Sequence, residues 1–260
     1  MSIEKAILFL VLVMGGGLLS LLIRKNNIKF LKLLLAFTGA YIMGIIFLHL
    51  APEVYAGGNG NAGYFVLIGF FLQLLLEHLS KGVEHGHIHL HEGQKKSTYA
   101  MQVLIGLCLH SFLEGMPLSS GFEEMAHHHH HGEDDHGHHH HHGPGLLGSA
   151  HLFWGIVAHH VPAAFALGAL FLTAGYSKRF IFLGIFAFAA MTPAGAWSAG
   201  LFTWTEAGFT ALIAIVLGAF LHIATTILFE ADDTSHHRIS TRKLIAVILG
   251  IGIALLSTLL

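Results

Sequence analysis

The chain has 260 residues, of which 54% are hydrophobic and only 11% are charged, and its mean hydropathy is +0.67. A soluble domain carries about 25% charged residues, so this composition excludes an ordinary water-facing surface. The formal net charge of -2 gives no support to nucleic-acid binding, and the single cysteine, Cys108, rules out an intramolecular disulfide. The sequence instead holds 24 histidines, and histidine is the commonest metal-binding side chain.

Long apolar runs separated by short charged gaps predict an all-α, polytopic membrane protein with eight transmembrane helices and both termini extracytoplasmic. The first run begins almost at Met1 and lacks a clear cleavage site, which indicates a retained helix rather than a signal peptide. We expect a single transmembrane domain over residues 1–260, because each run can cross about 30 Å of hydrocarbon. The predicted spans are residues 4–23, 30–51, 63–81, 98–121, 149–174, 179–200, 207–229 and 244–260.

The charges of the predicted loops support this count. Lys and Arg occur in the loops after the first, third, fifth and seventh spans, and are missing from the loops after the second, fourth and sixth. Because basic loops stay in the cytoplasm, the eight-span arrangement places twelve of the thirteen basic residues inside, with Lys5 as the exception. We therefore expect an integral membrane protein, located in the bacterial inner (plasma) membrane.

Two predicted loops are rich in histidine. The loop at residues 82–97 contains histidines at 85, 87, 89 and 91, and we expect it on the cytoplasmic side. The loop at residues 122–148 contains His127–His131 and His138–His142 and is expected outside. A solvated linker would explain the polarity of these tracts but not the choice of histidine, so weak and labile metal binding is the better interpretation.

Ionisable residues inside the predicted spans point to a metal pathway, because such groups are costly in a bilayer. His110 and Glu114 lie four residues apart on the fourth span and share one helix face. The fifth span carries His159 and His160 at a similar depth, followed by Pro162, which frees a backbone carbonyl near the histidines. Imidazole and carboxylate groups are ligands that zinc accepts at about 2.0–2.2 Å.

Further ionisable groups flank this centre at successive depths. Some lie toward the outside and others toward the inside, as a permeating metal would need in order to enter and leave. The outer group is His49, Glu53 and His151, and the inner group is Glu77, His78, His222 and Glu230. Glu53 and Glu230 are as readily explained as interfacial residues.

Five motifs resemble segments of the ZIP (Zrt/Irt-like) family of divalent metal transporters. Residues 110–115 (HSFLEG) are similar to the family's His-Asn-x-x-Asp/Glu-Gly, and residues 159–163 (HHVPA) to its His-Glu-x-Pro-His/Glu. Residues 49–53 (HLAPE), 192–195 (TPAG) and 218–222 (GAFLH) also match family segments on the second, sixth and seventh spans. Each motif is weak alone, but together they occur in the right order on the right spans.

The resemblance implies import of zinc (Zn2+) or a related divalent metal toward the cytoplasm. In the family, the fourth and fifth spans build a two-metal centre. Spans one, four, five and six are thought to slide against spans two, three, seven and eight, and homodimers are common. The implied partners are the divalent metal ion, the lipid bilayer and a second copy of the chain.

Four positions depart from the family pattern. Ser111 replaces the Asn, His160 replaces the Glu, Ala163 replaces the second ligand of the fifth span, and Thr192 stands where some members have Glu. We therefore expect one central metal, held by His110, Glu114 and His159 with His160 as a candidate fourth ligand, and a second position that is largely dismantled.

Other functions fit the sequence less well. An intramembrane metalloprotease would need His-Glu-x-x-His, which the chain lacks, and no Gly-Lys-Ser/Thr phosphate loop is present for an ATP-driven pump. A di-haem cytochrome would need opposed histidines without a carboxylate beside them, whereas Glu114 accompanies His110. A metal sensor or receptor that does not transport, built on the same fold, stays open as the alternative. We expect no enzyme activity.

Overall fold

The structure, a computed structural model, describes residues 1–22, 28–56, 60–80, 96–119, 145–230 and 240–257. Over these residues it is helical throughout and contains no strand. The fold class predicted from the apolar runs is therefore confirmed at the level of an all-α protein. Most of the two histidine-rich loops, residues 82–95 and 122–144, lies outside the described residues.

Each predicted span coincides with a helix. The second span is continued by a π-helical turn and a short helix, and the fourth ends in a 3-10 turn. The observed elements are α1 (Ile3–Leu19), α2 (Ile28–Ile45), η1 (Ile46–Leu50), α3 (Ala51–Ala56), α4 (Ala62–Ser80), α5 (Lys96–Gly115), η3 (Met116–Leu118), α7 (Gly145–Thr173), α8 (Lys178–Ala199), α9 (Glu206–Glu230) and α10 (Thr241–Leu256).

Six of these helical segments are long and apolar enough to cross a membrane. They correspond to the second through seventh predicted spans. Helices α1 and α10 have 17 and 16 residues, which is about 25 Å at 1.5 Å per residue and short of a 30 Å hydrocarbon layer. The helices thus make this an integral membrane protein, while the count of eight spans stays a prediction.

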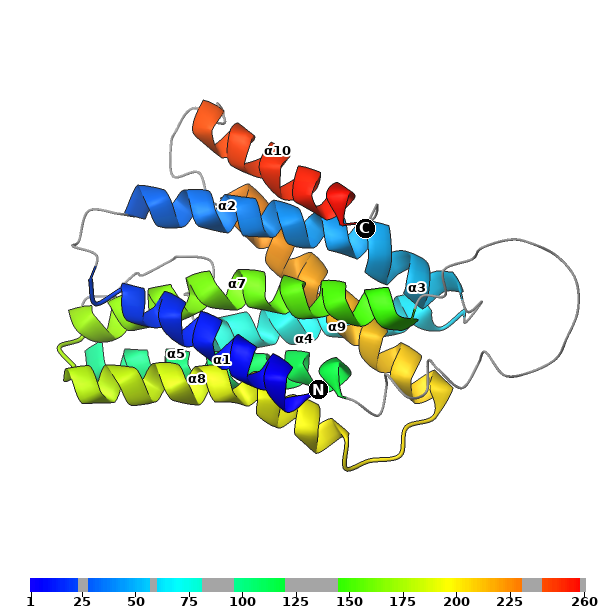
Figure 1. The fold of residues 1–260 in the computed structure, drawn as a ribbon, viewed down its shortest axis with the longest axis horizontal. Coiled ribbons are helices and arrows are strands. Elements are labelled where there is room, and N and C mark those ends of the chain that lie inside the picture. The colour runs from blue at the N-terminus through cyan, green and yellow to red at the C-terminus, as the bar shows by residue number, and fades with distance from the viewer. Residues whose placement is uncertain (23–27, 57–59, 81–95, 120–144, 231–239, 258–260) are drawn as a thin grey trace, which may run out of the picture.

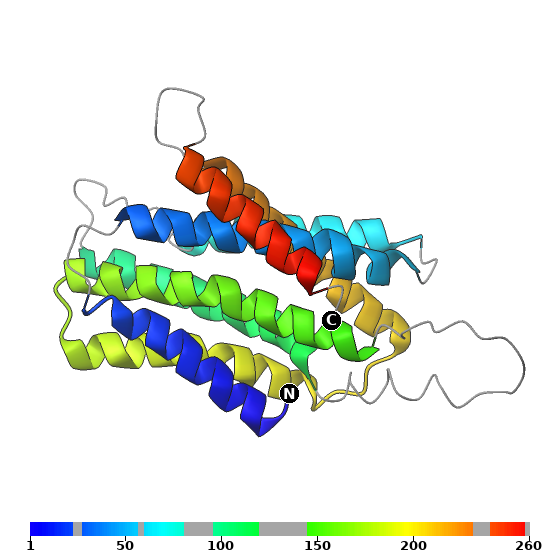
Figure 2. The ribbon, with the colours of Figure 1, turned by 45° about the horizontal axis from the view of Figure 1, so that its top comes forward.

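The helices pack as two groups. Helices α1, α5, α7 and α8 contact one another closely, and α2, α4, α9 and α10 form the other group; α5 with α4 and α7 with α2 join the two. Figure 1 shows the elongated bundle, and Figure 2 shows the two groups as separate layers. Helix α1 begins and α10 ends toward the same end of the bundle. These are the two groups that the family resemblance implies.

Close backbone contact fixes α5 against α8. A Cβ atom at Gly115 would lie 2.1 Å from the carbonyl oxygen of Thr192, and one at Gly195 would lie 2.0 Å from that of Phe112. Real Cβ contacts are never this short, so any larger residue would push the helices apart. The two glycines thus let α5, which carries His110 and Glu114, lie directly against α8.

The second span changes pitch at a histidine. Residues Ile46–Leu50 form a π-helical turn in which the amide of Ala51 donates to the carbonyl of Ile46, five residues back. Pro52, which has no N–H, follows directly in α3. Single π turns are frequent at functional sites, and here that turn carries His49.

Candidate metal centre

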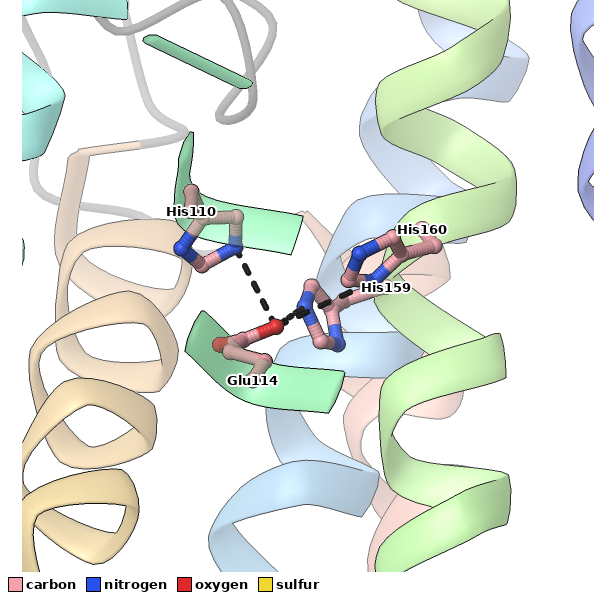
Figure 3. A group of neighbouring side chains, drawn as sticks. All are labelled: His110, Glu114, His159 and His160. Carbon is pink, nitrogen blue, oxygen red and sulfur yellow. Dashed lines mark hydrogen bonds and ion pairs between the residues drawn. The ribbon is translucent and has the colours of Figure 1, made fainter. Parts of the chain in front are cut away.

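Four buried side chains from α5 and α7 meet in the middle of the first helix group. His110 and Glu114 come from α5, and His159 and His160 come from α7. One ligand atom from each lies within 4.8 Å of those of the other three, and Figure 3 shows the side chains pointing toward one another. None is more than 4% exposed. The fold therefore brings together the four residues that the sequence predicted at the centre.

The carboxylate of Glu114 is the hub of this cluster. Its Oε2 atom lies 2.7 Å from His159 Nε2, 3.3 Å from His110 Nε2 and 3.9 Å from His160 Nδ1. Donor atoms bound to one tetrahedral zinc at about 2.0–2.1 Å are about 3.4 Å apart. The distance from Glu114 to His110 is close to that spacing, whereas the 2.7 Å distance to His159 is shorter, so Glu114 and His159 would move apart slightly to bind one metal together with His110.

Hydrogen bonds fix which nitrogen of His159 can bind a metal. Its Nδ1 lies 2.9 Å from the carbonyl oxygen of Gly155, and because a carbonyl only accepts, Nδ1 must carry a proton. The Nε2 atom lies 2.7 Å from the carboxylate of Glu114. That contact is favourable only if either the imidazole or the carboxylate carries one more proton. A divalent cation would replace this proton with both groups as ligands.

His110 presents an unsatisfied nitrogen to the same point. Its Nδ1 donates to the side-chain oxygen of Gln73 at 2.9 Å, which leaves the lone pair on Nε2. Neither His110 Nε2 nor Glu114 Oε1 has a hydrogen-bond partner among the described residues, although both atoms are buried. An unpartnered buried polar atom costs about 1–3 kcal/mol, and a bound cation would remove that cost.

His160 is turned differently. Its Nδ1 donates to the carbonyl of Ile156 at 2.9 Å, and its Nε2 faces the hydroxyl of Thr192 at 3.4 Å. The ring stacks on Phe188 and meets the edge of Phe9. In this orientation neither nitrogen offers a lone pair to the point shared by Glu114 and His159, so His160 would have to reorient to become a fourth ligand.

The side chains expected at a second metal position hydrogen-bond to one another and to backbone carbonyls. Ser111 Oγ lies 2.8 Å from Thr192 Oγ1 and 3.2 Å from the carbonyl of Phe188, and Thr192 Oγ1 also donates to the carbonyl of Ser111. Ala163 is buried and offers no ligand atom. Ser111, predicted among the site residues, thus points toward α8 and away from the four-residue cluster.

The outer predicted residues form a smaller group. The rings of His49 and His151 stack with their centroids 3.8 Å apart, which joins η1 to α7 across the two helix groups. His49 Nε2 is buried and has no hydrogen-bond partner among the described residues. Glu53 lies four residues beyond His49 in α3 and is partly buried.

Only part of the inner group comes together. His222 on α9 pairs with the carboxylate of Glu77 on α4, and its ring meets the edge of Phe70. His78 is exposed at the end of α4, and the side chain of Glu230 lies outside the described residues. The inner pair is therefore Glu77 and His222.

Gln73 is the site residue that the sequence reasoning missed. It is 1% exposed on α4 and contacts His110 directly. An amide is not ionisable, so the cost of burying a charge in a bilayer does not single it out. The available signal was a lone amide within the apolar run of residues 63–76, four residues before Glu77 and so on the same helix face.

A comparison with protein families independently supports the resemblance to metal transporters. A family model described as ZIP zinc transporter matches residues 149–258, which cover most of α7 and all of α8, α9 and α10. No curated protein matches the chain. The matched region supplies His159, His160 and Thr192, whereas His110 and Glu114 lie before it and are joined to it by the geometry of the cluster. The resemblance drawn from the motifs is thus confirmed, with residues 149–258 matching the ZIP zinc transporter family.

Proposed function

We propose that this protein imports a divalent transition metal, zinc first, toward the cytoplasm, with the metal bound by His110, Glu114 and His159. One observation carries the proposal. Two imidazole nitrogens and a carboxylate oxygen converge in a buried place where the carboxylate is the only negative charge in the cluster. A bound cation would balance the charge of this carboxylate, and the mixture of imidazole and carboxylate ligands suits zinc.

The flanking pairs extend this site into a path. His49 and His151 would receive the metal from outside, and Glu77 and His222 would accept it on the inner side. Each pair supplies only two ligand groups, fewer than a closed zinc site needs. Weak sites of this kind allow the ion to move on, which transport requires.

The charge of the central site also favours transport over storage. Two neutral imidazoles and one carboxylate leave a divalent ion with a net charge of about +1 in a low-dielectric environment, which is costly. Binding is thus weaker than at a site with more carboxylates, and release is easier.

Flux into reconstituted vesicles tests the proposal. Purified protein should give saturable zinc uptake, and Glu114→Gln, which removes the charge while keeping the shape, should abolish it. His78→Ala is the matched control, since that histidine is exposed and outside the cluster. Absence of saturable uptake of zinc, iron, manganese, cadmium and nickel alike would rule out a transporter of these metals. Uptake that survives Glu114→Gln would rule out this route.

The proposed direction rests on the topology that the loop charges predict. Both termini and residues 122–148 would face outside, and residues 82–97 would face the cytoplasm of a bacterial cell. Cysteines introduced at positions 90 and 135 on a Cys108-free background should react with an impermeant label from opposite sides of the membrane. Labelling from the same side would contradict the topology. We also propose a homodimer, which cross-linking in membranes would reveal.

A metal sensor or receptor is the alternative, and the second position favours it. Ser111, Thr192 and Ala163 supply no carboxylate there, so the chain has fewer metal ligands than the family pattern. A sensor would bind zinc at the centre and give no flux in the vesicle assay, whereas a transporter gives both.

A further inference from the structure

Gln73 differs from the other groups that orient the central histidines, because it is a side chain on a different helix. His159 and His160 are each held by a carbonyl of their own helix, four residues back, at Gly155 and Ile156. His110 is held instead by a side chain from another helix, because its Nδ1 donates to Gln73 Oε1 at 2.9 Å. The orientation of one predicted ligand thus depends on a residue of α4.

This hydrogen bond determines which His110 nitrogen is available. A proton on Nδ1 leaves the lone pair on Nε2, and Nε2 is the atom 3.3 Å from Glu114. Without an acceptor at Gln73, the proton could equally occupy Nε2, which would block the ligand position. Histidines that bind metals usually donate their other N–H to a fixed acceptor, and removing that acceptor typically costs 10–100-fold in metal affinity.

The bond also crosses between the two helix groups. Gln73 lies on α4, which packs mainly on α9, and His110 lies on α5, which packs mainly on α8. Both side chains are buried, at 1% and 2% exposure, so water is poorly placed to replace either partner. A relative shift of the two groups by one helical turn, about 5.4 Å, would break a contact of 2.9 Å.

We propose that Gln73 is the positioning residue of the metal site, holding His110 ready for the metal only while the two helix groups keep the arrangement seen here. This rests on the proposed function, because it assigns a role at the same site. The metal would be held most tightly in this arrangement and more weakly once α5 moves away from α4. Gln73 itself contributes no metal ligand.

Three substitutions in the full-length protein test the role. Gln73→Leu removes the acceptor and keeps a similar size, Gln73→Glu keeps an acceptor at the same reach, and Gln102→Leu is the matched control on an exposed face of α5. Zinc uptake by vesicles gives the half-saturating concentration and the maximal flux separately. Cobalt(II) added to the purified protein gives an absorption spectrum that reports the number and geometry of its ligands.

We expect Gln73→Leu to raise the half-saturating zinc concentration roughly 10–100-fold with maximal flux largely kept, and to weaken the tetrahedral cobalt bands. Gln73→Glu should restore both readouts to near the wild-type values, and Gln102→Leu should change neither. If Gln73→Leu fails to fold, Gln73→Met supplies the same test. An unchanged half-saturating concentration, or an equal loss in the Leu and Glu variants, would overturn the role.

The two levels of the proposal fail differently. A wild-type protein that gives no flux overturns the transport function, while the cobalt spectrum still reports whether Gln73 orients His110. A wild-type protein that transports zinc with an unaltered Gln73→Leu variant overturns the positioning role alone.

Discussion

Two neighbouring positions differ in which buried polar atoms they leave without hydrogen-bond partners. The first is formed by His110, Glu114 and His159 on α5 and α7, and the second by Ser111, His160 and Thr192 on α5, α7 and α8. At the first, the nitrogen of His110 and one oxygen of Glu114 are buried without hydrogen-bond partners among the described residues. At the second, Ser111, Thr192 and His160 form hydrogen bonds with one another and with backbone carbonyls. His110 and Ser111 are adjacent on α5, yet only His110 keeps a buried atom able to bind a cation, because the neighbours of Ser111 complete its hydrogen bonds.

Removing a ligand of the first position should have the largest effect on zinc binding and flux. His110→Ala or Glu114→Ala should weaken zinc binding by more than the roughly 100-fold upper range seen for loss of an outer-shell partner, and saturable flux should disappear. Zinc uptake and binding by competition with a chelator would measure this, with thermal unfolding to show that the variants stay folded. Retention of tight binding in either variant would place the metal elsewhere.

Lowering the pH should have the next largest effect on zinc affinity at the first position. The imidazoles of His110 and His159 must be deprotonated at the nitrogen that binds the metal, so protons compete directly with zinc. Each competing proton raises the apparent dissociation constant by up to about tenfold per pH unit. Binding measured across a pH series should weaken once the pH falls below the pKa of these imidazoles in the metal-free protein, which is near 6.5 for an unperturbed histidine. An affinity that stays constant at every pH below that pKa would exclude imidazole ligands.

The outer histidine pair should matter less than the centre. His49→Ala and His151→Ala should each raise the half-saturating zinc concentration several-fold and spare maximal flux, because the pair would collect metal without holding it through transport. Uptake kinetics over a range of zinc concentrations would separate these effects. A complete loss of flux in a folded variant would instead make this pair part of the central step.

Changes at the second position should have the smallest effect on the metal. Ser111→Ala should leave zinc affinity nearly unchanged and destabilise the protein by about 1 kcal/mol, the usual net value of a hydrogen bond. Chemical unfolding and zinc titration of the same sample would measure both quantities. An affinity loss as large as that of Glu114→Ala would mean that the second position binds metal after all.

Much of the fold followed from local patterns in the sequence. The apolar runs predicted the positions of all the long helices, and the spacing of four residues placed His110 and Glu114 on one face. The antiparallel run of α7 then brought His159 to the same depth. These inferences need only helix geometry and the thickness of a bilayer, so the sequence was sufficient for them.

Other features depend on contacts between distant helices. Gln73 reaches His110 from α4, and Ser111 turns to Thr192 on α8; no periodicity within one helix predicts either contact. The π turn at His49 was also not predicted. The carbonyls that orient His159 and His160 lie within their own helix. Only the structure shows that it is Nδ1 of each ring that donates to them.

We expect one divalent metal to bind at the first position and none at the second. Crystals of the protein grown with zinc, with diffraction data collected at the zinc absorption edge, would test it most directly. We predict a single anomalous peak between Glu114 and the Nε2 atoms of His110 and His159. Two peaks within about 4 Å of each other, the usual two-metal spacing, or a peak beside Ser111 and Thr192 with none at Glu114, would contradict the account.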